Sequence, residues 1–453
     1  MVPISFKSAA EAVGSKTALD GKFNSISTDS RKIQERCLFI ALEGDNFDGH
    51  DYAKKALELG ASAVMVHKDC GLSEKQILVK DTRIALLDLA GYYRSLFNIP
   101  FVGVTGSVGK TTTKEMVWTV LSSKYKTLKN EGNLNNEIGV PLTLFRLDET
   151  YEAAVIEMGM SHFNEISRMT KAVKPDISLI TNIGVSHIEN LGSREGILKA
   201  KMEILEGMNP NAPIILNGDD DMLSKANCGT HPVTYYGIEN SSCAFKARNI
   251  TSIDDEITFD CDFGGGSVGV CLPFVGRHYI YNSLAAVAVG EKLGVDVKAG
   301  LESLKNYKTT GFRQKMVKRN GITFIEDCYN ASPDSQAAAM SVLKNINAKR
   351  KIAVIGDMLE LGDYSETAHK LVGQYAVNNG IDILFTYGEK SLAAASEANK
   401  LGLKDVRSYT DKSKLSLDLY SELKSGDAVL FKASRGMKLE DVIFEIYDYL
   451  DKK

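Results

Sequence analysis

Short apolar runs alternate with helical stretches along nearly the whole chain, and this alternation limits the folds that are open to it. A strand followed by a helix and another strand usually builds a parallel sheet that helices cover. Ligands bind such sheets beyond the carboxyl ends of the strands. We therefore predict an α/β protein with largely parallel sheets, whose main strands are 37–41, 63–66, 101–104, 153–156, 177–181, 214–216, 323–325, 352–355, 383–387 and 428–431.

The chain is long enough for about three domains, because it has 453 residues and a domain takes roughly 100–200. In the first, Gly60 is expected to end a helix over 51–59. The second is expected to leave its parallel pattern for antiparallel strands over 229–272 and to return to helix over 282–292. We predict an N-terminal α/β domain, a central P-loop ATPase-type domain with a mostly parallel sheet, and a C-terminal Rossmann-like, doubly wound domain, at residues 1–81, 82–309 and 310–453.

Composition and charge exclude several classes of protein. Fifty-four basic and 58 acidic residues give a net charge of −4, so the chain has no overall basic field to hold nucleic acid or an anionic membrane. Its seven cysteines are scattered and never spaced C-x-x-C, which is typical of buried thiols in a reducing compartment. No signal peptide is evident, and the most apolar stretch, 84–104, is interrupted by Asp88, Arg94 and Pro100. We predict a cytoplasmic protein with no membrane span and no nucleic-acid partner.

A glycine-rich turn follows the apolar run 101–104 and leads into a helical stretch. Its sequence, Thr-Gly-Ser-Val-Gly-Lys-Thr-Thr at 105–112, would gather backbone N–H groups around one phosphate-sized space. Lys110 would add a positive charge at the β- and γ-phosphates, and the Thr111 hydroxyl would reach Mg²⁺. The standard P-loop has glycine where this chain has Val104. The alternative is a tight strand-to-helix turn with an exposed lysine.

Two side chains further along could bind a metal ion. Glu157 ends the apolar run 153–156 beside the glycine-rich turn, where a carboxylate could bind the Mg²⁺ of a nucleotide. His187 lies in the loop after the run 177–181. The alternative for Glu157 is an ordinary acid at the end of a strand, and for His187 a hydrogen-bonded structural residue.

The helix predicted around residue 200 places a lysine among apolar side chains. At about 100° per residue, Lys201 falls inside the apolar arc formed by Ile197, Leu198, Ala200, Met202, Ile204 and Leu205. Lys199, Glu203 and Glu206 fall on the opposite, solvated face. Burial favours the neutral amine, so Lys201 is expected to contact phosphate or to be chemically modified. The alternative is a lysine that reaches past the apolar surface to water.

These segments, in this order, resemble the Mur ligase family, whose members use ATP to form amide bonds in peptidoglycan precursor synthesis. The resemblance covers nearly the whole chain and includes the displaced glycine of the phosphate loop. The matching motifs are TGSVGKTT (105–112), NLNNEIGVP (133–141), EMG (157–159), GVSHIENLGS (184–193), AKMEI (200–204) and DCYNASPDS (327–335).

The resemblance implies a role for each matching residue. It implies two Mg²⁺ ions held by Thr111, Glu157, His187 and Lys201, the last as a carbamate, and it makes Lys110, Lys201, His187 and Glu157 the catalytic set. Tyr279 stands where the family usually has asparagine. The residues implied to bind ATP are Gly106, Ser107, Val108, Gly109, Lys110, Thr111, Thr112, Asn282 (adenine), Arg313 (ribose or γ-phosphate) and Asp327 (ribose).

Three segments are similar to the branch of the family that joins D-alanyl-D-alanine to a UDP-N-acetylmuramoyl-tripeptide. They are NLNN (133–136), YNASP (329–333) and GDMLELG (356–362), and the motif DNPR of the diamino-acid-adding branch is not found. The resemblance implies that Ser30, Arg31, Asp48 and His50 bind the UDP end of the substrate. The candidates for the dipeptide are Tyr329, Asn330, Lys432 and Arg435, the last two at the end of the run 428–431, where a helix start would form an anion site.

The resemblance implies a cytoplasmic, monomeric ligase that acts in cell wall biogenesis and so affects cell shape, cell division and the cell cycle. A substrate carboxylate would attack the γ-phosphate of ATP, and the dipeptide amine would then attack the acyl phosphate. The alternatives are the diamino-acid-adding ligase, a folylpolyglutamate synthase, and a P-loop ATPase or GTPase switch that forms no bond. The sequence has no clear N-K-x-D motif for guanine, which disfavours the GTPase.

Overall fold

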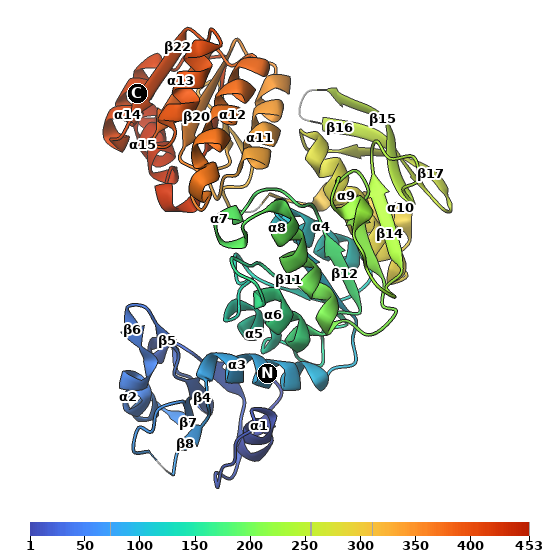
Figure 1. Ribbon diagram of the computed structural model, residues 1–453, viewed down its shortest axis with the longest axis vertical. Coiled ribbons are helices and arrows are strands. Elements are labelled where there is room, and N and C mark those ends of the chain that lie inside the picture. The colour runs from blue at the N-terminus through green and yellow to red at the C-terminus, as the bar shows by residue number, and fades with distance from the viewer. Residues whose placement is uncertain (73, 254–255, 310, 453) are drawn as a thin grey trace.

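The computed structural model describes residues 1–72, 74–253, 256–309 and 311–452. Figure 1 shows three domains arranged along the long axis, from the N-terminal domain (blue) through the central domain (green and yellow) to the C-terminal domain (orange and red). The α/β class and the three-domain organisation are confirmed. The predicted boundaries stay predictions, and Thr310, where the last domain is predicted to begin, lies outside the described residues.

The N-terminal domain is built on a parallel sheet with the order β3-β4-β7-β8. Its apolar strands are continuous because both faces are covered. The bounds are β1 (Ile4–Ser5), α1 (Phe6–Ala12), β2 (Lys22–Phe23), β3 (Ser25–Ser27), β4 (Cys37–Ile40), β5 (Glu43–Gly44), β6 (Phe47–Asp48), α2 (Ala53–Glu58), β7 (Ala61–Val66) and β8 (Gln76–Leu78), with 3₁₀ helices η1 (Ser30–Lys32) and η2 (Gly49–Tyr52).

The central domain has a sheet with the order β10-β11-β9-β12-β13-β14-β15-β16-β17. Pairing is parallel from β10 to β15 and antiparallel from β15 to β17. The prediction for 229–272 is therefore wrong for β14, which continues the parallel sheet. The strands are β9 (Phe101–Thr105), β10 (Thr127–Lys129), β11 (Ala153–Glu157), β12 (Ile177–Ile180), β13 (Ile214–Asn217), β14 (Val233–Gly237), β15 (Phe245–Ile253), β16 (Glu256–Phe263) and β17 (Gly266–Leu272).

Helices cover both faces of this sheet because alternate strand residues point to opposite sides. Phe101 packs against the face that carries α3, α5 and α6, whereas Val102 and Val104 pack against α4 and α9. The bounds are α3 (Thr82–Ser95), α4 (Lys110–Ser122), α5 (Gly139–Leu144), α6 (Glu165–Val173), α7 (Ile188–Leu191), α8 (Arg194–Met202), α9 (Arg277–Lys292) and α10 (Val297–Ser303), with η3 (Glu203–Gly207), η4 (Leu223–Lys225) and η5 (Leu304–Asn306).

The C-terminal domain has a doubly wound sheet with the order β18-β19-β23-β20-β21-β22, parallel except for β18. Helices α11, α12 and α13 cover one face, and α14 and α15 cover the other. The bounds are β18 (Lys315–Arg319), β19 (Ile322–Glu326), α11 (Pro333–Asn345), β20 (Arg350–Gly356), η6 (Gly362–Tyr364), α12 (Ser365–Asn378), β21 (Ile383–Tyr387), α13 (Leu392–Lys400), β22 (Asp405–Tyr409), α14 (Lys412–Glu422), β23 (Asp427–Lys432), η7 (Arg435–Met437) and α15 (Glu440–Asp451).

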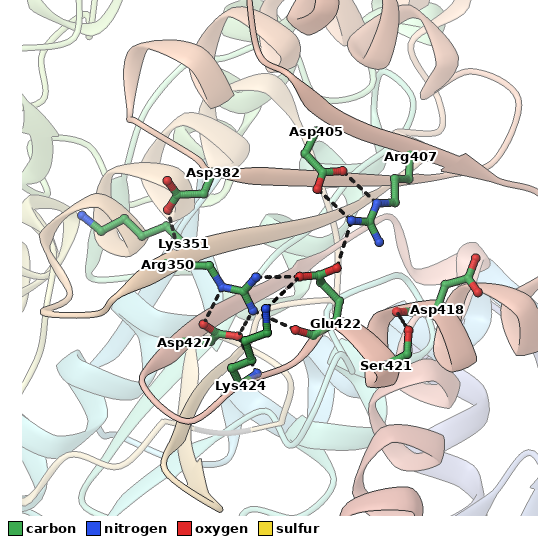
Figure 2. A network of polar contacts seen from close by, with 10 residues as sticks. All are labelled: Arg350, Lys351, Asp382, Asp405, Arg407, Asp418, Ser421, Glu422, Lys424 and Asp427. Atoms are coloured by element: carbon green, nitrogen blue, oxygen red, sulfur yellow. Dashed lines mark hydrogen bonds and ion pairs between the residues drawn. The ribbon is translucent and has the colours of Figure 1, made fainter.

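A network of charges ties the amino ends of these parallel strands to the end of α14 (Figure 2). Arg350 donates two hydrogen bonds to Asp427, at 3.0 and 2.7 Å, and two to Glu422, one to its carboxylate at 2.6 Å and one to its carbonyl at 2.7 Å. Arg407 contacts the same Glu422 and Asp405. Because ligands bind at the opposite, carboxyl ends of the strands, this network holds the scaffold and leaves the binding edge free.

Two predictions from composition have a structural outcome. All seven cysteines lie in the described part of the chain as free thiols; four are buried as expected, whereas Cys70, Cys243 and Cys271 are partly exposed. Among the described residues, no helix is both long and apolar enough to cross a membrane.

Candidate functional site

The glycine-rich turn connects β9 to α4 in a conformation that only glycine adopts easily. Gly109 caps α4 at φ +79°, and no side chain accepts a hydrogen bond from the first turn of the helix within the described residues. A Cβ on Gly106 would lie 1.9 Å from Thr181 Oγ1, so the backbone passes that strand end too closely for any side chain. The amides at the start of α4 are therefore left free for an anion.

Lys110 folds back over this turn. Its Nζ donates hydrogen bonds to the carbonyls of Gly106 at 2.8 Å and Ser107 at 3.1 Å. Burial lowers the pKa of Lys110, while Glu157 opposes this shift. A phosphate bound in the turn would place negative charge beside the Lys110 amine and so favour its protonated form.

Glu157 ends β11 with one of its oxygens unpaired. Oε1 accepts hydrogen bonds from Thr111 Oγ1 at 3.2 Å and Asn135 Nδ2 at 2.7 Å. Oε2 is buried and has no hydrogen-bond partner among the described residues, and the nearest cation, Lys114 Nζ, is 3.8 Å away. A buried carboxylate oxygen without a partner fits a metal ligand, so the residues present fit the expected Mg²⁺.

His187 reaches the same region from the loop after β12. It lies in the left-handed conformation at φ +63°, which is uncommon for a side chain of this size. Its Nδ1 is 2.6 Å from Glu360 Oε2, a residue of the C-terminal domain. This contact lowers the pKa of Glu360. Within the described residues, no three His, Cys, Asp or Glu side chains form a metal site by themselves. At nucleotide sites Mg²⁺ is usually bound by one or two carboxylates together with substrate phosphates.

Lys201 is buried, as the helical pattern predicts. It is 1% exposed, and its Nζ donates to the carbonyl of Gly106 at 2.8 Å, the same oxygen that Lys110 contacts. Burial, together with the nearby Lys110 charge, lowers its pKa well below 10.5. The solvated position predicted for Glu203 is wrong: this carboxylate is buried and accepts hydrogen bonds from the amides of residues 164 and 167. The reason is that α8 ends at Met202 and continues as a 3₁₀ turn, which changes the helical period.

A cavity of about 980 Å³ collects most of the predicted residues between the central and C-terminal domains. Its walls include Lys110, Thr111, Glu157 and His187, the residues expected to bind phosphate and Mg²⁺. Gly106 and Lys201 are not among the residues that line the cavity. They contact each other through the hydrogen bond from Lys201 Nζ to the Gly106 carbonyl. The other predicted residues in the lining are Ser107, Val108, Gly109, Thr112, Asn282, Arg313, Asp327, Tyr329, Asn330 and Lys432.

The nucleotide end of the cavity is rich in aromatic side chains. Asn282 Oδ1 accepts a hydrogen bond from Thr113 at 3.0 Å, which leaves its amide nitrogen for a ligand. Tyr279 is buried and stacks on Phe274, with ring centroids 4.7 Å apart. Burial raises the pKa of Tyr279 well above 10. An aromatic edge thus replaces the amide of the usual asparagine beside Asn282.

The C-terminal wall holds a lysine that is already paired. Lys432 is 3% exposed, and its Nζ donates to Asp327 Oδ2 at 2.8 Å and to the Asn330 carbonyl at 3.1 Å. Arg313 lies 3.8 Å above the Tyr329 ring. Arg435 lies outside the described lining, paired with Glu440. The helix start predicted after Lys432 is only the short η7, and α15 begins later, at Glu440.

The residues predicted to hold the UDP end lie in the N-terminal domain, outside this cavity. Asp48 accepts a hydrogen bond from Lys68 at 2.7 Å and contacts the His50 ring, whereas exposed Arg31 pairs with Asp29. Ser30 begins the short helix η1 that carries Arg31. In the described residues, no hydrogen bond or ion pair joins Asp48 or His50 to Ser30 or Arg31.

Sequence reasoning missed several residues of the site. Asn135 and Lys114 both lie beside Glu157. Asn135 belongs to the motif 133–141, which was singled out without a role for it, whereas Lys114 lies two residues beyond the glycine-rich motif. Glu360 belongs to the segment 356–362, which the resemblance also singled out without a role. Asp334 approaches Gly184 so closely that a Cβ there would lie 2.2 Å from its carboxylate.

Comparisons with known proteins agree with this geometry. Three Mur ligase descriptions match successive parts of the chain: the "Mur ligase family, catalytic domain" at residues 22–94, the "Mur ligase middle domain" at 104–290 and the "Mur ligase, glutamate ligase domain" at 312–435. A Bacillus subtilis (strain 168) protein, the UDP-N-acetylmuramoyl-tripeptide–D-alanyl-D-alanine ligase, is 39% identical over 93% of each chain. The chain belongs to the Mur ligase family.

Solved structures of Mur ligases have the same architecture. A crystal structure of MurF from Acinetobacter baumannii matches with a TM-score of 0.92 and 30% identity, covering 98% of this chain and 99% of that one. MurF ligase from Thermotoga maritima in complex with ADP matches with a TM-score of 0.86 and 29% identity, covering 94% and 98%. ATP binding, expected from the phosphate loop, is supported by that complex.

Proposed function

We propose that this Mur ligase joins D-alanyl-D-alanine to UDP-N-acetylmuramoyl-tripeptide, with ATP converted to ADP and phosphate, in peptidoglycan precursor synthesis. The observation that carries this proposal is the shared cavity, where the phosphate loop and Glu157 face Asp327 and Lys432 of another domain. Full-length similarity to UDP-N-acetylmuramoyl-tripeptide–D-alanyl-D-alanine ligases supports the choice of substrates.

The phosphate loop holds and orients ATP for an in-line attack. The substrate carboxylate attacks the γ-phosphorus, ADP leaves, and an acyl phosphate forms. Lys110 then lies against the transferred group, and the amides at the start of α4 hold the β-phosphate. The dipeptide amine attacks the acyl carbon, the amide bond forms and phosphate leaves. No side-chain nucleophile is required, so most of the catalysis is positioning and charge compensation.

Thr111, Glu157 and His187 are the residues that would hold Mg²⁺. When bound, Mg²⁺ offsets the negative charge of the phosphates and of the attacking carboxylate. The unpaired Oε2 of Glu157 supports this assignment. Asn135 and Thr111 hold the other oxygen of the carboxylate and so fix its direction.

Lys201 is proposed to act as a carbamate. Its neutral amine adds CO₂, a C–N bond forms, and one proton is released, which leaves a carboxylate that can bind metal. The low pKa of Lys201 supports this step, because only the uncharged amine reacts. Bicarbonate or a short carboxylate is expected to restore part of the activity that Lys201→Ala loses. Full activity of Lys201→Ala would remove this role.

The substrates are assigned to the two outer domains. Ser30, Arg31, Asp48 and His50 are proposed to hold the UDP end, and the C-terminal wall is proposed to hold the dipeptide. Lys432 and Tyr329 line the cavity, and the Arg435 guanidinium lies 5.9 Å from the Tyr329 ring, so Arg435 stays a candidate for the dipeptide beside them. The monomeric state, the cytoplasmic location and the domain boundaries remain predictions.

Substrate-dependent phosphate release tests the proposal. With ATP and UDP-N-acetylmuramoyl-tripeptide present, phosphate release is expected with D-alanyl-D-alanine and not with diaminopimelate, lysine or glutamate as the acceptor. Release with a diamino acid would favour the diamino-acid-adding ligase, and release with glutamate on a folate substrate would favour a folylpolyglutamate synthase. Turnover of ATP without any acceptor would favour a switch.

A further inference from the structure

The loop that carries His187 is held by the C-terminal domain at several points. Helix α7, directly after His187, lies at the boundary between the central and C-terminal domains (Figure 1). Ile188 packs against apolar clusters of both domains. Gly362 lies against Glu189, so that a Cβ at Gly362 would be 3.2 Å from the Glu189 side chain. The Asp334 carboxylate lies against Gly184 of the same loop, so that a Cβ at Gly184 would be 2.2 Å from it.

Within this boundary, Glu360 covers one nitrogen of the His187 ring. Nδ1 of His187 is buried and lies 2.6 Å from Glu360 Oε2, within ion-pair distance but without the angles of a hydrogen bond. The His187 side chain is 20% exposed and lines the cavity, whereas Glu360 lies outside the described lining. The carboxylate contacts the ring at Nδ1, and no group in the described part of the chain forms a hydrogen bond with Nε2.

Glu360 holds a conformation that costs energy. It lies at φ +62°, and its partner His187 lies at φ +63°, both in the left-handed region that such side chains rarely adopt. Strained backbone of this kind persists where the surrounding structure holds it, and it concentrates at functional sites. Two of the ten non-glycine residues with positive φ in the described chain thus meet across the domain boundary.

We propose that Glu360 is a positioning residue that fixes the His187 imidazole with Nδ1–H toward the C-terminal domain and the Nε2 lone pair toward the cavity. A histidine that binds a metal through one nitrogen usually donates its other N–H to a carboxylate, which fixes the ring and its tautomer. Glu360 belongs to the C-terminal domain, so the His187 ring has this orientation only while that domain packs against the central domain. The inference rests on the proposed role of His187 in holding Mg²⁺.

Binding of Mn²⁺ measures this role without turnover. The protein is loaded with a non-hydrolysable ATP analogue, and free Mn²⁺ is followed by electron paramagnetic resonance during titration. Glu360→Ala is expected to weaken one Mn²⁺ site by roughly 10–100-fold, the usual cost of losing such a partner. Glu360→Gln should lose less, because its amide oxygen can occupy the same place beside Nδ1. The matched control is Asp363→Asn, which removes one charge from an exposed position on the same segment.

His187→Ala separates the two possible failures. If His187→Ala weakens a Mn²⁺ site and Glu360→Ala does not, the positioning role is wrong and the metal role stands. If neither variant changes Mn²⁺ binding, the metal role of His187 itself fails, and the inference fails with it. Equal losses in Glu360→Ala and Asp363→Asn would also overturn the inference, because they indicate a general effect of charge.

The tautomer of His187 gives an independent readout. In the metal-free protein, ¹⁵N shifts of the imidazole are expected to show a protonated Nδ1 and a bare Nε2. Glu360→Ala should shift this population toward the Nε2–H form, while Glu360→Gln keeps it. An unchanged tautomer in Glu360→Ala would contradict the proposal. Circular dichroism melts confirm that each variant is folded.

Discussion

Replacing Lys201 with methionine should make the central domain more stable near neutral pH while removing most of the activity. The native amine is fully buried, and its pKa lies well below the ordinary 10.5. The unfolded chain therefore binds a proton that the native state lacks, and the stability of the unmodified protein rises with pH between the native pKa and 10.5. Methionine has no such dependence, and it fills a similar volume.

The size of the effect follows from this linkage. The difference in unfolding free energy between Lys201→Met and the parent should shrink by about 1.4 kcal/mol for each pH unit between the native pKa and 10.5. The lost hydrogen bond to the Gly106 carbonyl subtracts about 1 kcal/mol at every pH. Urea titrations at several pH values measure the difference, with Trp118 as the probe, since this single tryptophan lies on α4 of the same domain.

Lys199→Met is the matched control, because Lys199 is exposed on the same helix, two residues earlier. It should change stability little and with no pH trend. The reasoning is refuted if Lys201→Met is less stable than the parent by the same amount at every pH, since the native amine would then carry its charge. Carbon dioxide is excluded from the buffers so that the free amine is measured.

Three further changes have expected outcomes. Gly106→Ala should cost about 2 kcal/mol of stability and weaken ATP binding, because the new Cβ meets Thr181; calorimetry with ATP would contradict this if affinity were unchanged. Arg350→Met should cost about 2 kcal/mol in the C-terminal domain and leave the KM values unchanged, because buried Asp427 loses its partner; an unchanged melting temperature would refute it. Arg435→Ala should raise the KM for the dipeptide far more than the KM for ATP, and equal effects would remove Arg435 from the dipeptide site.

Local features of the fold were predictable from the sequence. The phosphate loop is encoded within one strand, one turn and one helix, so its residues reveal its shape. The burial of Lys201 follows from the period of a single helix. The strands β18 and β22 were missed because each lies at an edge of its sheet and carries charged residues such as Lys318 and Arg407 instead of an apolar run.

Features that depend on domain packing could not be predicted in this way. Glu360 meets His187 only because two domains are packed together, and nothing near either residue encodes the contact. Glu203 is buried because the helix before it tightens, which a constant helical period does not anticipate. The resemblance to a family identified the segment of Glu360, but only the coordinates give it a partner.

Transfer of oxygen from the tripeptide carboxylate to phosphate tests the central claim most directly. The protein is incubated with ATP, D-alanyl-D-alanine and UDP-N-acetylmuramoyl-tripeptide labelled with ¹⁸O in the reacting carboxylate. Mass spectrometry should find one ¹⁸O in the released phosphate and one in the new amide, because the acyl phosphate passes its bridging oxygen to phosphate. Phosphate released without ¹⁸O, or without any new amide product, would contradict the account.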